Sequence, residues 1–298
     1  MDVDLGRTHR TFDVAVAGGD LRVGCWGDGP TTLIAAHGLT GSHANFEALA
    51  AQLGDDYTVL APDLRGRGGS NALGAPFGMA AHADDVAAVL DHAGVERATV
   101  LGHSMGGFVA VVTADRHPDR VSDLVLVDGG FPLAAVEAFA DMPIEDVVRA
   151  VVGPALDRLR MTFASLDAYL DYWRPHPALE DDWNEYIEHT YAYDLVGTAP
   201  ELRSSAVETA VLEDSASELR SGDVERALAG LRRPAVLVRA ELGIFNQEPP
   251  LYPDDALAAA RQRVPQLRDA LVAGVNHYTI LLSERGAKAV AAVVREAR

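Results

Sequence analysis

The amino-acid sequence predicts an α/β fold in which a mostly parallel sheet is flanked by helices and interrupted by a helical insertion. Short β-branched runs alternate with helix-length segments up to residue 131 and again after residue 230, as expected of βαβ units. Between them, residues 132–230 contain no β-branched run and follow a helical pattern with repeated prolines. The chain therefore divides into a core, residues 1–131 and 231–298, and an inserted block, residues 132–230, called the insertion below.

The elements of the core follow from local patterns taken in chain order. The first two strands alternate apolar and polar residues on either side of Gly18-Gly19, which suits a hairpin turn. The middle four are continuously apolar, as expected of strands buried on both faces, and the last two follow the insertion. The eight predicted strands span 12–17, 21–26, 31–36, 57–61, 97–101, 121–127, 235–239 and 267–273. The predicted core helices span 44–53, 81–93, 105–116, 254–264 and 283 onward.

The insertion is rich in aromatic residues. It holds two of the three Trp and five of the eight Tyr. These are Trp173, Trp183, Tyr169, Tyr172, Tyr186, Tyr191 and Tyr193. We expect this helical block to form a cap, or lid, whose aromatic side chains roof an apolar pocket.

The protein is acidic, with 44 Asp and Glu against 25 Lys and Arg and a formal net charge of −19. The insertion contains 20 of the acidic and 7 of the basic residues, so 13 of the net negative charges lie there. Because this charge repels phosphate backbones and anionic lipids, it argues against a nucleic-acid binder or a protein of the membrane surface.

Composition and motifs exclude further classes. The single cysteine, Cys25, rules out an intramolecular disulfide and a Cys-based zinc site. Residues 1–7 lack the basic and apolar regions of a signal peptide, and no stretch approaches the ~20 apolar residues that span a bilayer. No binding motif for a metal or an organic cofactor is found. We therefore expect a soluble, cytoplasmic protein that needs no cofactor, whereas the sequence does not indicate an oligomeric state.

The sequence G-H-S-M-G at 102–106 follows a predicted strand and opens a predicted helix. The bare pattern G-x-S-x-G is weak, but this context makes it specific. A serine on a sharp strand-to-helix turn needs glycines on both sides, because a Cβ there would clash with neighbouring backbone. Such a turn lifts the hydroxyl of Ser104 above the edge of the sheet, at the N-terminus of the helix.

With this motif, the chain resembles the α/β-hydrolase family from about residue 12 to the C-terminus. H-G-L-T-G-S at 37–42 resembles the oxyanion loop of that family, and D-L-R-G-R-G-G-S at 63–70 resembles its D-x-R-G-x-G-x-S turn. V-N-H-Y at 275–278 resembles its catalytic-histidine turn, and the insertion falls where the family places its cap. The resemblance implies an α/β-hydrolase fold with an eight-stranded, mostly parallel sheet.

Acyl transfer requires a base beside the serine nucleophile, since serine is a poor nucleophile near neutral pH. His277 follows the last strand and is expected at the same edge of the sheet as Ser104. His103 is expected to point to the opposite side of its strand, and His37 to brace its loop. The resemblance assigns the two oxyanion donors to the backbone N–H groups of Leu39 and Met105.

The acid of the triad departs from the family pattern. Most members carry an Asp in the loop after the strand before last, but the matching stretch R-A-E-L-G at 239–243 has glycine there. Asp128 ends the sixth strand and is the favoured candidate, because two glycines after it leave room for a turn towards His277. Glu241 is the alternative, with Glu248 third.

The expected reaction is hydrolysis of a neutral, hydrophobic carboxylic ester or lactone, because a Ser nucleophile favours acyl transfer and the acidic insertion disfavours anionic substrates. One alternative is a C–C bond hydrolase of a ring-cleavage product, which several arginines facing the pocket would support. Another is a non-catalytic ligand receptor on the same scaffold.

Overall fold

The computed structural model describes residues 9–133, 142–220 and 222–297. Residues 1–7, for which the sequence predicts no signal peptide, lie outside the described residues, and so does the part of the insertion at 134–141.

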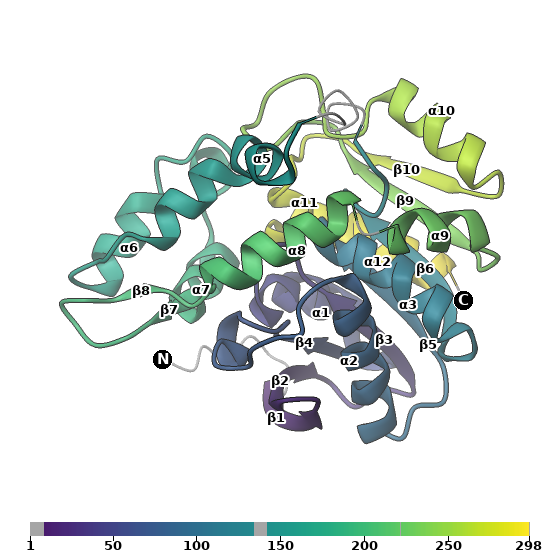
Figure 1. Cartoon of the computed structure of the whole chain (residues 1–298), viewed down its shortest axis with the longest axis horizontal. Helices are drawn as coiled ribbons and strands as arrows, with labels where there is room; N and C mark the ends of the chain where they lie inside the picture. The colour runs from purple at the N-terminus through teal and green to yellow at the C-terminus, as the bar shows by residue number, and fades with distance from the viewer. Residues whose placement is uncertain (1–8, 134–141, 221, 298) are drawn as a thin grey trace.

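An eight-stranded sheet with the order β1-β2-β4-β3-β5-β6-β9-β10 runs through the molecule (Figure 1). Its strands are β1 (His9–Val16), β2 (Gly19–Trp26), β3 (Thr31–Ala36), β4 (Tyr57–Pro62), β5 (Ala98–His103), β6 (Val121–Val127), β9 (Ala235–Ala240) and β10 (Arg268–Val272). β2 pairs antiparallel with β1 and with β4, whereas the other neighbours are parallel. The structure thus confirms the predicted fold class.

Helices cover both faces of this sheet, so its central strands are apolar on both sides. Along β3, Ile34 packs into the hydrophobic cluster beneath α2, α3 and α10, while Leu33 packs into the cluster beneath α1 and α12. The helices are α1 (Glu47–Leu53), α2 (Met79–His92), α3 (Met105–Arg116), α10 (Asp254–Arg263), α11 (Thr279–Leu282) and α12 (Glu284–Glu296). Because the inner strands are parallel, their carboxyl ends meet at one edge, where the site lies.

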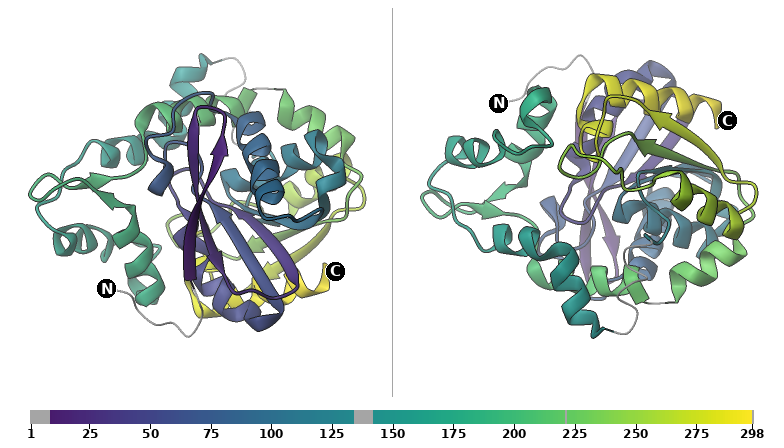
Figure 2. Two further views of the ribbon diagram at one scale, coloured as in Figure 1. Left: turned by 90° about the horizontal axis from the view of Figure 1, so that it is seen from below. Right: turned by 90° about the horizontal axis from the view of Figure 1, so that it is seen from above.

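The described part of the insertion contains five α-helices, a short 3-10 helix (Glu180–Asp182) and one small pair of strands. Its elements are α5 (Ile144–Leu159), α6 (Leu166–Trp173), α7 (Glu185–Asp194), β7 (Leu195–Val196), β8 (Arg203–Ser204), α8 (Glu208–Arg220) and α9 (Asp223–Gly230). In both views of Figure 2, α6, α7 and the β7–β8 pair project to one side of the sheet. The sequence pattern missed β7 and β8 because a two-residue antiparallel pair needs no β-branched run.

The last helix of the insertion packs differently from the others. Val224, Ala227 and Leu228 of α9 belong to the same hydrophobic cluster as α3. α9 therefore helps to cover the sheet, while α6 and α7 share a separate cluster that is rich in aromatic rings.

Two buried carboxylates tie the insertion to the core. Asp214 of α8 bonds to Arg67, lies 3.0 Å from Nε2 of His82 and accepts the backbone N–H of Gly78. Burial by itself raises the pKa of Asp214, but the charges and hydrogen bonds of these groups outweigh it and hold the pKa at about 2. Asp214 therefore stays ionised and fixes α8 against the turn at 63–70.

The second tie is Asp63 of the core, which faces α7. Its Oδ1 lies 2.9 Å from Nδ1 of His43, and its Oδ2 accepts the hydroxyl of Tyr193 at 2.7 Å and the backbone N–H of Gly69 at 2.7 Å. Burial opposes ionisation here too, yet His43 and Tyr193 lower the pKa of Asp63 to about 2.

Candidate active site

Ser104 occupies a strained turn between β5 and α3. Its backbone has φ 54° and ψ −123°, which is unusual for a residue other than glycine. A Cβ on Gly102 would lie 2.0 Å from the carbonyl oxygen of Gly106, and one on Gly106 would lie 2.0 Å from that of Ala36. The glycines on both sides of Ser104 are therefore required by close backbone packing, as the sequence predicts.

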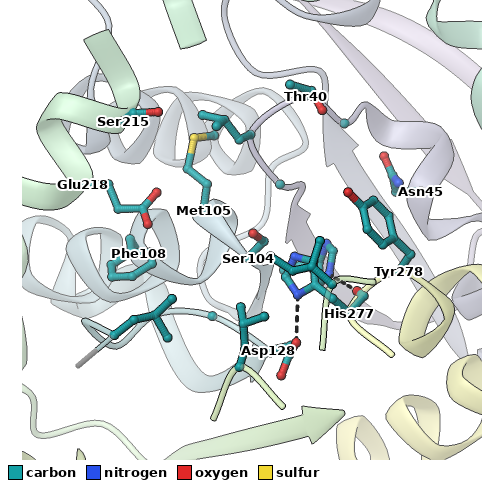
Figure 3. Close-up of a pocket in the computed structure, with 18 of the residues that line it drawn as sticks. Thr40, Asn45, Ser104, Met105, Phe108, Asp128, Ser215, Glu218, His277 and Tyr278 are labelled. Atoms are coloured by element: carbon teal, nitrogen blue, oxygen red, sulfur yellow. Dashed lines mark hydrogen bonds and ion pairs between the residues drawn. The ribbon is translucent and has the colours of Figure 1, made fainter. Parts of the chain in front are cut away.

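His277 and Asp128 are brought together across the edge of the sheet. Asp128 follows β6 with φ 45° and is fully buried, and its Oδ2 lies 2.8 Å from Nδ1 of His277. Its Oδ1 accepts the backbone N–H of Ala240 at 3.2 Å, so β9 holds the carboxylate in place. Figure 3 shows the imidazole of His277 between Asp128 and the hydroxyl of Ser104.

The other candidate acids lie elsewhere. Glu241 is exposed, and its Oε2 accepts the backbone N–H of Gly274 at 2.7 Å, three residues before His277. It braces the turn that carries the histidine, and no hydrogen bond joins it to the imidazole among the described residues. Glu248 is also exposed. The structure thus pairs His277 with Asp128 and with neither of these glutamates.

The loop at 37–42 lies directly above the serine. A Cβ on Gly38 would lie 3.2 Å from Cβ of Ser104. His37 braces this loop as expected, because its Nε2 accepts the N–H of Leu64 at 2.9 Å and its Nδ1 donates to the carbonyl of Gly38 at 2.7 Å. Burial lowers the pKa of His37 to about 4, so the ring is neutral.

The proposed oxyanion donors, Leu39 and Met105, both line the cavity beside Ser104. Met105 is the first residue of α3, where no helical carbonyl accepts its N–H. The carbonyl oxygen of Leu39 accepts a hydrogen bond from Nε of Arg67 at 2.9 Å, and this bond holds the peptide of the loop in place.

His103 does not point away from the site, so that expectation is wrong. Its Nε2 lies 2.8 Å from the carbonyl oxygen of His277, and the centroids of the two rings are 4.8 Å apart. Burial lowers the pKa of His103 to about 3, so the neutral ring donates this bond and supports the backbone of His277. Nothing in the local sequence signals the contact, since it joins residues 174 positions apart.

These residues form the floor of a cavity of about 950 Å³, and the insertion forms its roof. We use floor for Ser104, Asp128, His277 and the loop at 37–42, and roof for the cavity-lining residues of the insertion. Of the seven aromatic residues expected to roof the pocket, Tyr172, Trp173 and Tyr191 line it, and Trp173 stacks on Tyr191 at 4.1 Å. Tyr169 packs inside the insertion instead.

Positive charge in the described lining of the cavity is sparse. Among the described lining residues, Arg158 is the one Lys or Arg, and it is compensated: its Nη1 lies 3.4 Å from Asp194 and donates to the hydroxyl of Tyr169 at 3.1 Å. Its guanidinium also lies over the ring of Trp173, 5.0 Å from the centroid. No group of three or more His, Cys, Asp or Glu in the described part of the chain is arranged to hold a metal ion.

Sequence reasoning also missed two polar residues of the roof. Ser215 and Glu218 of α8 line the cavity, and Figure 3 shows both on the wall opposite His277. Acidic and hydroxyl residues on a helix are usually solvated, so no signal in the sequence distinguishes these two from their neighbours.

The sheet order, the serine turn between β5 and α3 and the helical segment after β6 together define an α/β scaffold of hydrolase type. The chain belongs to the alpha/beta hydrolase fold family, whose model matches residues 31–283. No helix in the described ranges is both long and apolar enough to cross a membrane.

One relative matches over most of the chain. The 2-(acetamidomethylene)succinate hydrolase of Mesorhizobium japonicum is 31% identical over 253 residues, which cover 85% of this chain and 83% of that protein. A crystal structure of E-2-(acetamidomethylene)succinate hydrolase superposes with a TM-score of 0.75 at 26% identity, covering 97% of this chain and 98% of the other.

Other relatives match only in part. Uncharacterized proteins of Mycobacterium bovis and Mycobacterium tuberculosis are 38% identical over 104 residues, 35% of this chain and 30% of their own length. The lipase LipV of Mycobacterium tuberculosis is 36% identical over 132 residues, 44% of this chain and 49% of the lipase. The family comprises hydrolases that include esterases and lipases, and these matches identify this chain as a member without fixing its substrate.

Proposed function

We propose that this protein is a serine hydrolase that cleaves a neutral, hydrophobic carboxylic ester or lactone through an acyl-enzyme intermediate. Ser104 is the nucleophile, His277 the base and Asp128 the acid of the triad. The observation that carries the proposal is the 2.8 Å contact between His277 and a fully buried Asp128, beside a serine held on a strained turn.

The mechanism follows from the tautomer that this contact selects. With Nδ1 of His277 donating to Asp128, Nε2 is left to accept the proton of Ser104 as its Oγ attacks the ester carbonyl. The backbone N–H groups of Leu39 and Met105 bind the oxygen that becomes negative. His277 then returns the proton to the leaving alcohol, and water releases the acid from Ser104 by the same steps.

The charges of the cavity favour a neutral substrate. A substrate with one or more carboxylates would need cations, and the described lining offers only Arg158, which Asp194 already compensates. The shortage of cations therefore argues against a succinate derivative, such as the one in the relative's name, as the substrate of this protein. The shortage of arginines also counts against a C–C bond hydrolase of carboxylated ring-cleavage products.

A panel of p-nitrophenyl esters of increasing acyl length tests the proposal. Wild type is expected to hydrolyse the esters with apolar acyl groups, and Ser104→Ala to lose at least about 10³-fold in kcat. Ser122→Ala, on β6 and outside the cavity lining, is the matched control and should retain wild-type rates. An absence of Ser104-dependent hydrolysis across the panel would contradict the proposal.

A further inference from the structure

α8 presents different residues to the core and to the cavity. Towards the core, Asp214 bonds to Arg67, and the hydroxyl oxygen of Ser217 accepts the backbone N–H of Met79 at 3.1 Å. Towards the cavity, Ser215 and Glu218 stand three positions apart and so share one face of the helix (Figure 3).

Neither cavity-facing residue has an internal partner. Oγ of Ser215 is buried, and no hydrogen bond to it is found within the described residues. The carboxyl group of Glu218 likewise makes no hydrogen bond or ion pair with any residue that the structure describes. Buried polar groups normally have partners, so the unpaired hydroxyl of Ser215, with the half-buried carboxyl of Glu218 beside it, points to a partner that is bound in the cavity.

The environment of Glu218 determines which form of the carboxyl is present. Burial, followed by the negative charge of nearby Asp214, raises its pKa to about 8. The group therefore keeps its proton at neutral pH and can donate a hydrogen bond. The one cationic residue of the described lining, Arg158, is already engaged with Asp194.

We propose that Ser215 and Glu218 form a subsite for an uncharged oxygen group of the substrate, a hydroxyl or carbonyl that lies away from the ester to be cleaved. The protonated carboxyl of Glu218 donates to this oxygen, and the hydroxyl of Ser215 donates to it or accepts from it. The inference rests on the proposed function and narrows its substrate class to hydrophobic esters or lactones that carry a second oxygen function.

The test compares p-nitrophenyl esters that end in a hydroxyl group with those that end in a methyl group, over a series of chain lengths. The measured quantity is the ratio of kcat/KM for the two members of each pair, in which effects on the triad cancel. At the chain length that reaches α8, wild type is expected to prefer the hydroxyl member roughly fivefold to tenfold at neutral pH.

Three variants assign this preference to α8. Ser215→Ala and Glu218→Met should each bring the ratio towards one. Glu213→Met, on the exposed side of the same helix, should keep the wild-type ratio. A wild-type ratio near one at every chain length, or a ratio unchanged in both cavity-side variants, would overturn the inference.

The pH dependence separates a neutral oxygen group from a cationic one. The ratio for the hydroxyl pair should fall above about pH 8 as Glu218 loses its proton, and it should stay constant with pH in Glu218→Gln. A stronger preference for the ester that ends in an amine would overturn the assignment to an uncharged group.

A binding measurement covers the case in which the proposed function itself fails. If wild type hydrolyses no ester, calorimetry with a long-chain alkanol and the corresponding diol still tests the subsite. Tighter binding of the diol, lost in Glu218→Met, would support the subsite without the reaction. Equal binding of the two alcohols would overturn it.

Discussion

Two catalytic candidates of the cavity floor, Ser104 and Asp128, are positioned by the backbone, whereas the roof is attached to the core by side-chain contacts. Ser104 and Asp128 both sit at strand ends with positive φ, and the position of each follows from the strand before it. The roof depends on contacts between distant residues, above all Asp214 with Arg67 and Tyr193 with Asp63. A floor built in this way tolerates little change, while a roof attached at a few points can differ among proteins that share the floor.

The largest expected effect is on kcat and comes from replacing Asp128, the buried carboxylate of the floor. Asp128→Asn should lower kcat by about 10⁴-fold, because the amide no longer selects the tautomer of His277 that frees Nε2. Glu241→Gln is the matched control: it alters the brace of Gly274 but no contact of the imidazole, so kcat should stay within about tenfold of wild type. Steady-state kinetics on one ester compares the two variants, and a collapse in Glu241→Gln alone would reassign the acid.

Replacing Asp214, the buried carboxylate that attaches the roof, should lower the stability of the fold more than it lowers kcat. Asp214→Ala leaves Arg67 buried without its partner, so the free energy of unfolding is expected to fall by about 3–5 kcal/mol. Urea unfolding measures this change, and Glu213→Ala on the exposed side of α8 is the control. A loss below about 1 kcal/mol would mean that side-chain pairing does not hold the roof.

Acid should weaken the floor and the roof in different pH ranges. The buried His37 and His103 have lowered pKa values, of about 4 and about 3, so the unfolded chain binds more protons than the folded one below about pH 6.5. The floor therefore loses stability as the pH falls from that value through 4 for His37 and on towards 3 for His103.

The roof loses stability at lower pH. Asp63 and Asp214, with pKa values of about 2 in the folded chain, contribute fully above about pH 4, and their contribution disappears as the pH falls to 2. Each lowered pKa corresponds to about 2 kcal/mol at neutral pH. Urea midpoints measured across this range should show Asp214→Asn with a shallower decline below pH 4 and an unchanged decline above it. A change in the upper range instead would contradict this division.

The two regions also differ in how far the sequence predicts them. Strand periodicity and the G-x-S-x-G turn are local patterns, so the eight strands, the position of Ser104 and the edge carrying His277 can be predicted from the amino-acid sequence alone. The sequence favours Asp128 over Glu241 because Asp128 ends the sixth strand and two glycines follow it. Its catalytic role stays a prediction that Asp128→Asn tests.

The roof could be predicted only as helical and aromatic. Which face of α8 meets the cavity depends on the Arg67–Asp214 pair, whose members lie 147 positions apart in the chain. A single sequence does not encode such a pairing in any local pattern, so Ser215 and Glu218 were missed. The contact of His103 with His277 was missed for the same reason.

The two faces of α8 have a consequence for divergence and engineering. Asp214 and Ser217 attach α8 to the core, whereas Ser215 and Glu218, on the neighbouring face, line the cavity. If Ser215 and Glu218 form the proposed subsite, substrate preference can change at two positions of one helix while the attachment of the insertion is kept. A library that randomises Ser215 and Glu218 alone should yield folded variants whose preferred acyl groups differ.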